Sequence, residues 1–262
     1  MSGLSWGADF TAKGSSTFPM RPLFYENPVA LHPAAHGGTR LAADLNYGFA
    51  RTTNAIPISL AEIPRASLSY PIAFTVEGGV RPVAVMGLHN DENLFVDADG
   101  HWVSGAYVPA YVRRFPFILA EYGEGEGVQL CIEDHPDILR ADAGHLLFAE
   151  GEPSSLVLSA FELCQSLRAA DIATSPFVEA LIACSVLEPR EAAITLPDGN
   201  KISMAGFAGI DEERFGALPD KAFVLLRKQG WLDAIYAQLR SNLNWSRLAD
   251  MVSERKTQRY EA

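Results

Sequence analysis

The chain has 262 residues, which is long enough to bury a substantial hydrophobic core in one large domain or two small ones. Hydrophobic residues make up 48% of it and charged residues 20%, as is typical of globular proteins. The net charge of −11 argues against binding to nucleic acid or to an anionic membrane surface, because both depend on a surplus of Lys and Arg. The composition therefore predicts an acidic soluble protein.

The cysteines and the N-terminus indicate a cellular compartment. Cys131, Cys164 and Cys184 lie far apart among apolar neighbours and form no C-x-x-C pair, so we expect buried thiols rather than a zinc site or a disulfide framework. The first residues lack the charged and apolar regions of a secretory signal. No run of about eighteen apolar residues is present to form a membrane span. We therefore expect a cytoplasmic protein without a membrane span.

The first half of the chain has the pattern of strands. Residues 1–20 are rich in Gly, Ser and Thr without periodicity, which predicts a flexible arm. Prolines then recur at a density that long helices do not tolerate. Apolar runs on either side of Gly-rich or Asp-Gly turns predict β-hairpins at 70–88, 94–103 and 116–134. The segment HLLFAEGE, at 145–152, predicts one more short strand.

Beyond Pro153 helices are expected. Apolar spacing predicts a helix with its N-cap at Ser154, and the pair Ser175–Pro176 predicts the start of a second helix. A hairpin around a Pro-Asp-Gly turn follows at 191–207. The chain then predicts a helix that ends at Gly230, and one further helix directly after it.

Together these elements predict an α+β fold. The N-terminal portion is rich in antiparallel hairpins, and helices of the C-terminal portion pack against it. We favour a single domain over residues 21–255. A boundary near residue 150 is the alternative, although no linker marks it.

Residues 92–117 concentrate aromatic side chains, an Asp-Gly turn and a pair of arginines. The aromatic residues either line a concave ligand site or pack across strands in the core. On an extended segment the two arginines point to opposite faces. One is then structural, with Glu121 or Glu133 as a candidate partner, and the other is available to bind an anion. The candidate ligand- or partner-binding residues are Asn93, Trp102, Tyr107, Tyr111, Arg113 and Arg114.

Three polar residues have the types found in an iron-binding facial triad, namely His89, Asp91 and His145. The H-x-D spacing is frequent by chance, and His145 opens an apolar strand. The sequence has no nucleophile elbow and no phosphate-binding glycine motif. We therefore expect neither a metal nor a cofactor.

The segment DADG, at 97–100, resembles the start of a calcium-binding loop. Such a loop needs a glutamate at its twelfth position, and the twelfth residue from Asp97 is Val108. A hairpin turn is predicted instead, with Gly100 at a positive φ.

Several segments, in order along the chain, resemble successive blocks of the SapC family. They are YPIAFT, GLHNDENLFVDADGHW, YVPAYVRRFPF, GHLLFAEGE, LPDGNKISMAGFAGIDEERF and GWLDAIYAQLRSNLNW, and they extend from about residue 40 to residue 250. The resemblance implies no particular reaction. Genes of this family in bacteria often lie near those for TonB-dependent receptors, halogenase-like flavoproteins and cupin-like proteins. The resemblance thus implies an accessory role at the cell surface, or in modifying an imported or secreted molecule.

The leading functional hypothesis is a non-enzymatic binding or accessory protein. It would recognise a peptide, protein or small molecule handled by a surface-transport system, and a flavin-dependent halogenase-like protein is a candidate partner. One alternative is an enzyme, either an oxygenase or one that modifies peptides or amino acids. Another is a structural component of surface-layer assembly or export. The accessory hypothesis predicts a groove or patch with a polar rim, whereas the enzyme hypothesis predicts polar groups that converge in a cleft.

Overall fold

A computed structural model describes residues 22–122, 127–195, 199 and 201–261. It contains both helices and antiparallel sheets, which confirms the predicted α+β fold. The described residues form two compact units, each made of two separate stretches of chain: 22–45 with 114–166, and 46–113 with 167–261. Neither unit begins or ends near residue 150, and the single domain stays a prediction. The predicted N-terminal arm lies outside the described residues.

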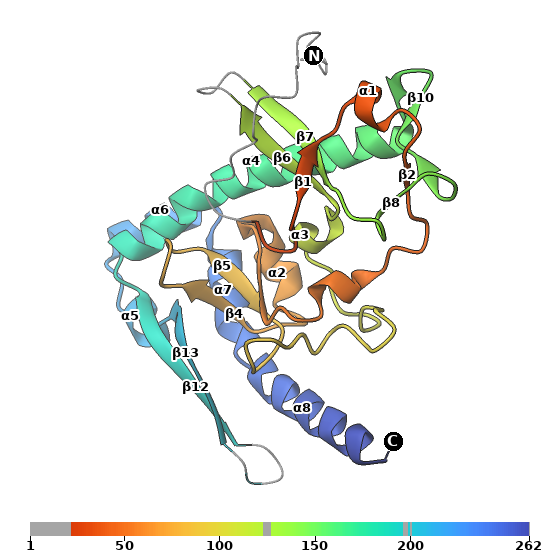
Figure 1. Cartoon of the computed structure of the whole chain (residues 1–262). Coiled ribbons are helices and arrows are strands. Elements are labelled where there is room, and N and C mark those ends of the chain that lie inside the picture. The colour runs from red at the N-terminus through yellow and green to blue at the C-terminus, as the bar shows by residue number, and fades with distance from the viewer. Residues whose placement is uncertain (1–21, 123–126, 196–198, 200, 262) are drawn as a thin grey trace. The chain divides into compact units, whose positions relative to one another are not determined.

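The first unit is built on small antiparallel sheets (Figure 1). The hairpin predicted at 116–134 is confirmed, and its second strand pairs on its other edge with the first strand of the chain. A second three-stranded sheet and a short hairpin complete the set. The strands are β1 (Pro28–Ala30), β7 (Gly127–Glu133) and β6 (Phe117–Tyr122) in the first sheet, β8 (Leu139–Arg140), β2 (Arg40–Leu41) and β9 (His145–Leu146) in the second, and β10 (Phe148–Ala149) with β11 (Glu152–Pro153) in the hairpin; helix α1 (Pro33–His36) lies between β1 and β2.

The segment predicted as a single strand at 145–152 contains β9 and β10, which belong to different sheets, and the first residue of β11. The chain turns back because Glu150 and Gly151 both have positive φ, at 54° and 85°. Two consecutive residues of this kind form a tight hairpin turn whose twist matches that of the flanking strands. The prediction was wrong because a glutamate does not signal a positive φ.

The hydrophobic core of the first unit lies among these strands and the start of helix α4 (Ser155–Ala183). Tyr25 is buried and donates a hydrogen bond of 2.6 Å to the carbonyl of Phe117. The predicted N-cap is confirmed, since Oγ of Ser154 accepts the amide of Val157 at 3.4 Å. Other buried core residues are Leu31, Leu130, Ile132, Leu147, Phe148 and Cys164. Cys131 is buried as predicted, but Cys184 is only half-buried.

Helix α4 contradicts the predicted break at Ser175–Pro176, because it continues through Pro176 to Ala183. Proline removes one backbone hydrogen bond from a helix interior and crowds the preceding turn. The residues after it, Phe177, Val178 and Leu181, are buried in the second unit. We infer that their packing outweighs the lost hydrogen bond, and the Ser-Pro pair is therefore not a helix start here.

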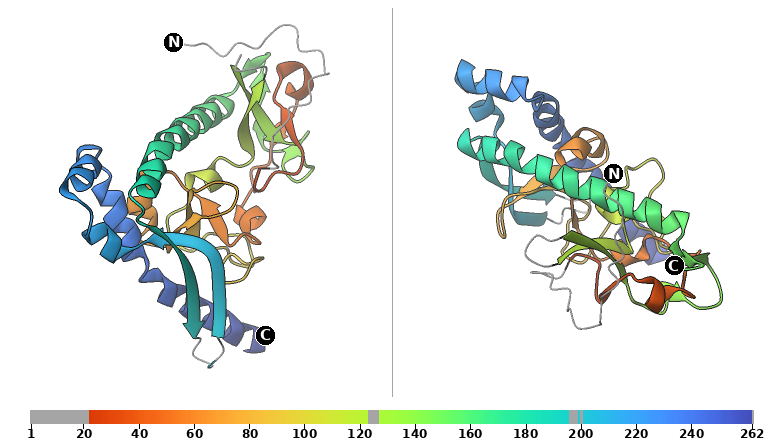
Figure 2. Two further views of the ribbon diagram at one scale, coloured as in Figure 1. Left: turned by 90° about the vertical axis from the view of Figure 1, so that its left-hand side faces the viewer. Right: turned by 90° about the horizontal axis from the view of Figure 1, so that it is seen from above.

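The second unit is organised around a five-stranded antiparallel sheet in the order β12-β13-β4-β5-β3. The hairpins predicted at 70–88 and 191–207 are confirmed. Most of the Pro-Asp-Gly turn predicted for the second of them lies outside the described residues. The β12–β13 hairpin is long, and β4 pairs only with Phe207 and Ala208 of β13. Figure 2 shows that its strands curve along their length. The strands are β3 (Ala55–Pro57), β4 (Ile72–Thr75), β5 (Pro82–Val85), β12 (Leu187–Thr195) and β13 (Lys201–Ile210).

Short helices and two longer C-terminal helices complete the second unit. Gly230 ends α6 at a positive φ, as predicted. The last predicted helix is two helices, because Nδ2 of Asn244 donates to the carbonyls of Ser67 and Tyr70 at 2.7 and 3.0 Å and thereby fixes a turn. The helices are η1 (Tyr47–Ala50), η2 (Leu60–Glu62), α2 (Ile63–Ala66), α3 (Ala110–Arg113), α5 (Glu212–Gly216), α6 (Asp220–Lys228), α7 (Leu232–Ser241) and α8 (Asn244–Glu261), with η denoting 3-10 helices.

Candidate functional site

Two of the predicted site residues, Trp102 and Tyr107, meet at the hydroxyl of Tyr70 in the second unit. Nε1 of Trp102 donates to the Tyr70 oxygen at 3.0 Å, and the Tyr70 hydroxyl donates to the carbonyl of Tyr107. The Tyr70 ring is buried and lies edge-on to Phe95, with ring centroids 4.6 Å apart. Burial raises the pKa of Tyr70 well above its usual value, so the hydroxyl remains a hydrogen-bond donor.

A buried carboxylate, that of Glu62, completes this group of residues. Its Oε1 accepts the Tyr107 hydroxyl at 3.0 Å and the amide of Ala110 at 2.8 Å. Its Oε2 accepts the amide and the hydroxyl of Ser59, both at 2.9 Å. Burial, and then the nearby Glu62 charge, raise the pKa of Tyr107. We call Ser59, Glu62, Tyr70, Trp102 and Tyr107 the Glu62 cluster. Its polar groups bond mainly to one another, as is required of polar groups away from water.

The predicted site residue Asn93 lies in a loop between Tyr70 and Trp102 in the chain and has a structural role. Its side chain is fully buried. Nδ2 donates to the carbonyl of Ala50 at 3.0 Å, and Oδ1 accepts the amide of Phe95 at 2.9 Å. Both bonds link the loop to the backbone of the same unit, so the Asn93 amide is committed to the fold rather than to a ligand.

The arginine pair does not lie on an extended segment, which contradicts the geometry considered from the sequence. Residues 110–113 form helix α3, whose first amide is capped by Glu62. Arg113 is exposed at the end of this helix, and its Nε donates to the carbonyl of Val108 at 3.2 Å. Tyr111 lies half-buried on the same helix.

Arg114 belongs to the first unit, whereas the other predicted site residues belong to the second. Its guanidinium carbon lies 5.8 Å from the centre of the Tyr25 ring, which is a cation–π arrangement. Glu133, one of its candidate partners, is buried and accepts the amides of Glu26 and Asn27, each at 2.9 Å. Arg114 therefore packs on the ring of Tyr25, and the carboxylate of Glu133 accepts hydrogen bonds from backbone amides.

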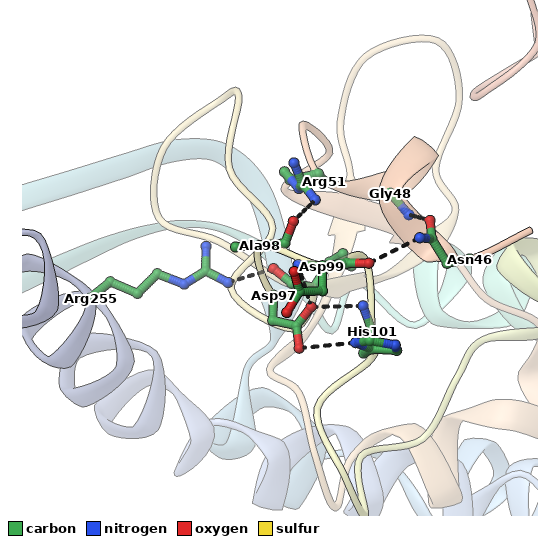
Figure 3. A network of polar contacts seen from close by, with 9 residues as sticks. Asn46, Gly48, Arg51, Asp97, Ala98, Asp99, His101 and Arg255 are labelled. Carbon is green, nitrogen blue, oxygen red and sulfur yellow. Dashed lines mark hydrogen bonds and ion pairs between the residues drawn. The ribbon is translucent and has the colours of Figure 1, made fainter. Parts of the chain in front are cut away.

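The predicted Asp-Gly turn at 97–100 is confirmed (Figure 3). It lies just before Trp102 in the chain. Oδ1 of Asp97 accepts the amides of Asp99 and His101 at 2.9 and 2.8 Å. These amide bonds are the main reason why the pKa of Asp97 lies below its usual range. Gly100 has a φ of +83°, as predicted. The flanking residues form only one isolated bridge, Val96 with Trp102, instead of two strands.

Three other side chains of the second unit donate hydrogen bonds to the backbone of this turn (Figure 3). Nδ2 of Asn46 donates to the carbonyl of Asp99 at 2.9 Å, and Nη2 of Arg51 donates to that of Ala98 at 2.6 Å. Nη2 of Arg255 donates to the carbonyl of Val96 at 2.8 Å. The backbone of the turn is thus fixed from several directions.

The same turn contains the group of side chains that could hold a metal ion within the described part of the chain. Ligand atoms of Asp97, Asp99 and His101 lie within 4.8 Å of one another, and all three residues are exposed. Oδ1 of Asp97 is already used by two amides. We interpret the group as a surface turn, and the absence of a metal stays a prediction.

A pocket of about 400 Å³ lies at the base of the β12–β13 hairpin, entirely within the second unit. Residues 190–193 of β12 and 207–210 of β13 form one side of it. Helices α7 and α8 form the other side, and Ile72 and Glu212 complete the lining. We call it the hairpin pocket. The residues lining it from the helices and the turn between them are Gln238, Leu239, Asn242 and Trp245.

Helix α7 is fixed to the sheet at the inner end of the hairpin pocket. The buried amide of Gln238 bridges two strands: Nε2 donates to the carbonyl of Ile72 at 2.9 Å, and Oε1 accepts the amide of Ile210 at 3.3 Å. Oγ of Ser241 accepts the amide of Ile72 at 2.9 Å. These bonds replace backbone pairing where β4 and β13 separate, so the pocket has a rigid inner end.

A charged network lies beside the hairpin pocket, on the side that we call its mouth, and Arg190 is the member of it that lines the pocket. Nη2 of Arg190 lies 3.3 Å from Oε2 of Glu188 and 3.1 Å from Oδ2 of Asp211. Nη2 of Arg214 lies 2.9 Å from Oε1 of Glu188. Asp211 also caps α5 by accepting the amide of Arg214, and this bond, more than the arginines, lowers the pKa of Asp211. The arginine at the mouth is therefore oriented by carboxylates.

The hairpin pocket was not predicted from the sequence. The available signal was a pair of small residues in each strand, since Ala192 and Ala193 of β12 and Ala208 and Gly209 of β13 all line the pocket. Small residues in strands mark places where another group approaches the backbone closely. Nothing in the pattern indicated that α7 and α8 would close the other side.

Comparison with known protein families identifies the family of this chain. The family model described as SapC matches residues 31–248. The chain belongs to the SapC family. Neither a curated protein nor a solved structure matches it. The SapC match includes the whole lining of the hairpin pocket and the Asp97 turn, whereas Arg255 lies beyond it. In the described part of this SapC protein, no helix combines the length and apolar character needed to cross a membrane.

Proposed function

We propose that this SapC-family protein is a non-enzymatic accessory protein that binds a small molecule, or a side chain of a peptide, in the hairpin pocket. The volume of the pocket, about 400 Å³, is the observation that carries this proposal. Pockets for small ligands commonly measure about 300–1,000 Å³ and combine apolar walls with a few polar groups. The hairpin pocket has this composition, with Phe207 and Trp245 beside Arg190, Gln238 and Asn242.

The state of the reactive side chains elsewhere supports binding over chemistry. Burial raises the pKa of Cys131 to about 12 and that of Cys164 to about 11, so both remain thiols rather than nucleophilic thiolates at neutral pH. In the Glu62 cluster the carboxylate accepts four hydrogen bonds from the protein. These groups are held in unreactive forms by the fold.

The proposed setting follows from the family resemblance. We propose that the bound molecule is handled by a bacterial cell-surface system, such as one that uses TonB-dependent receptors, or by a surface-layer pathway. A flavin-dependent halogenase-like protein is the proposed protein partner. We further propose that the chain acts in the cytoplasm, and cell fractionation tests this compartment directly.

Native mass spectrometry of the full chain, purified from its own host, tests the proposed function. We expect the wild-type protein to carry a bound small molecule. The variant Ala193→Tyr places a large side chain at the exposed rim of the pocket and is expected to lose it. Ala205→Tyr is the matched control, since Ala205 is exposed on the same hairpin and does not line the pocket.

Two results would contradict the proposal. One is the absence of a bound molecule from the wild-type protein, or binding of the same molecule to the Ala193→Tyr variant at the wild-type level. The other is conversion of the captured molecule into a product on incubation with the purified protein, which would make the chain an enzyme.

A further inference from the structure

We infer that the hairpin pocket selects an organic cation, that is, an ammonium or guanidinium group carried on a flat apolar body. This inference rests on the proposed function and names the class of its ligand. It follows from the charges at the pocket, from its aromatic wall and from an irregularity in the pairing of β12 with β13.

The charges of the pocket favour a cation. Three charged residues line it, Arg190, Glu191 and Glu212. Arg190 is already shared between the carboxylates of Glu188 and Asp211, at 3.3 and 3.1 Å. An incoming anion would therefore have to compete with two fixed carboxylates for this guanidinium.

The two carboxylates that line the pocket have no such neutralisation. Among the residues that the structure describes, neither Glu191 nor Glu212 forms an ion pair, and Glu191 accepts only the hydroxyl of Ser203. The charged lining residues are two glutamates and one arginine, which leaves one negative charge. With Glu188, Asp211 and Arg214, which belong to the ion-pair network of Arg190 and lie outside the lining, four negative charges less two positive ones leave two negative charges. A cation entering this mouth gains electrostatic attraction, whereas an anion is repelled.

A β-bulge lies beside the glutamate that lines the pocket from β12. In a regular pair of strands alternate side chains point to opposite faces. Here Arg190 pairs with Phe207 and Ala192 pairs with Met204, so Ala205 and Gly206 of β13 together lie opposite Glu191. The extra residue is on β13, where Gly206 has a φ of +88°. Bulges disrupt this alternation locally and re-aim side chains, and both Arg190 and Glu191 are among the residues that line the pocket.

The wall and floor of the pocket suit a flat apolar body. The Phe207 and Trp245 rings lie 5.4 Å apart at an interplanar angle of 30°, which forms an aromatic wall. Tryptophan is the side chain whose ring attracts cations most strongly. Opposite the helices, Ala192, Ala208 and Gly209 contribute only small side chains or none to the lining. A ring can lie against this surface while its charged group reaches the carboxylates.

Three probes of the same size separate the charge preference from simple ring binding: benzylamine, benzyl alcohol and benzoate, which are a cation, a neutral molecule and an anion at neutral pH. Isothermal titration calorimetry on the full chain at low salt is the measurement. We expect benzylamine to bind at least about tenfold more tightly than benzyl alcohol, and benzoate to bind more weakly than both. Raising the salt concentration to about 0.5 M is expected to remove most of the difference.

Variants on α5 locate the charge. We expect Glu212→Gln to weaken benzylamine binding about three- to tenfold and to leave benzyl alcohol unchanged. Glu213→Gln is the matched control, because Glu213 is the next residue of α5, is exposed and does not line the pocket. We expect Glu191→Gln to act like Glu212→Gln, with its folded state checked by circular dichroism.

Several outcomes overturn the inference. Benzoate binding as tightly as benzylamine, equal effects of Glu212→Gln and Glu213→Gln, or no binding of benzylamine would each do so. These results leave the proposed function standing if native mass spectrometry still shows a molecule that Ala193→Tyr removes. A protein that carries no molecule contradicts the proposed function itself.

Discussion

The Glu62 cluster and the hairpin pocket are made from similar residues in the same unit, yet they differ in what they leave open. The cluster contains one carboxylate and three aromatic rings, and the guanidinium carbon of Arg65 lies 5.7 Å from the centre of its Tyr107 ring. The pocket is lined by two glutamates, two aromatic rings and an arginine. In the cluster, the carboxylate of Glu62 is 8% exposed and accepts four hydrogen bonds from the protein. In the pocket, Glu191 and Glu212 are exposed and border an unfilled volume of about 400 Å³.

The difference shows that density of aromatic and charged residues does not by itself mark a binding site. Residues 92–117 are the most conspicuous part of the sequence, and most of their polar groups stabilise the fold. The pocket comes from an inconspicuous hairpin and two helices. What separates the two regions is whether the charges are already satisfied by the protein, and this requires knowledge of every neighbour.

The largest effect on stability is expected from the variant Glu62→Ala. It leaves the Tyr107 hydroxyl and the amides of Ser59 and Ala110 without their acceptor in a buried site. We expect a loss of about 3–5 kcal/mol in the free energy of unfolding. Urea unfolding followed by circular dichroism measures it. Glu77→Ala, at an exposed position, is expected to change it by less than about 0.5 kcal/mol. A loss below about 1 kcal/mol for Glu62→Ala would mean that the cluster is not closed.

A smaller effect on the free energy of unfolding is expected from substitutions in the Asp97 turn. Gly100→Ala combines a positive φ with a Cβ atom only 2.5 Å from the side chain of Asn46, so we expect a loss of about 1–3 kcal/mol. Gly105→Ala separates the two causes, because Gly105 has a φ of +77° and no atom near its Cβ position. Its loss is expected to be smaller. In an Asn46→Ala background the two glycine variants should cost the same, and a persistent difference would contradict the steric explanation.

The carboxylate of Asp97 predicts a pH dependence of the same turn. Its pKa is lower in the folded protein than in the unfolded chain, so it stabilises the fold at a pH above the unfolded value, and this is lost as the pH falls through the folded value. We expect the Tm difference between wild type and Asp97→Asn to be constant above about pH 5 and to shrink below about pH 4. Thermal melts across this range test it, with the exposed Asp142→Asn as control. A difference that grows on acidification would reverse the assignment.

The smallest expected effect on stability belongs to the pocket. Because Glu212 is exposed and forms no ion pair among the described residues, Glu212→Gln should change the free energy of unfolding by less than about 0.5 kcal/mol. The same urea experiment as for Glu62→Ala measures it. Two glutamates would then show opposite behaviour, one needed for folding and the other for binding. A large loss for Glu212→Gln would remove the distinction.

Much of the fold could be predicted because its signals are local. Alternating apolar residues around Gly-containing turns located the β4–β5, β6–β7 and β12–β13 hairpins, and Gly230 marked the end of α6. Local signals failed where distant contacts outweighed them. The Ser175–Pro176 pair did not start a helix, because buried Phe177 and Leu181 keep α4 continuous. The arginine pair was not extended, because Glu62, 48 positions away from Ala110, caps α3.

The candidate site could not be predicted for a related reason. Its inner end depends on Gln238 reaching Ile72, which lies 166 positions earlier in the chain. Its charged residues Arg190 and Glu191 are adjacent in sequence and lie beside a register shift between β12 and β13, which simple alternation of side chains does not predict. Neither the long-range hydrogen bond nor the register shift can be recognised within one short segment of the sequence. The SapC resemblance extended over these segments, but it indicated the family and did not predict a pocket.

The division of each unit into two stretches of chain has a consequence for synthesis on the ribosome. The first unit needs only residues up to 166, and contacts such as that from the Glu26 amide to Glu133, 107 positions apart, can form once these have emerged. The second unit waits longer, because the bond from the Ile72 amide to Ser241 spans 169 positions. Residues 46–113 are therefore made early and must remain without their final partners while the first unit folds around its own sheet. During that interval the nascent chain exposes the apolar segments that later form β4 and β5. A chaperone that binds these segments would therefore act before the chain is released from the ribosome.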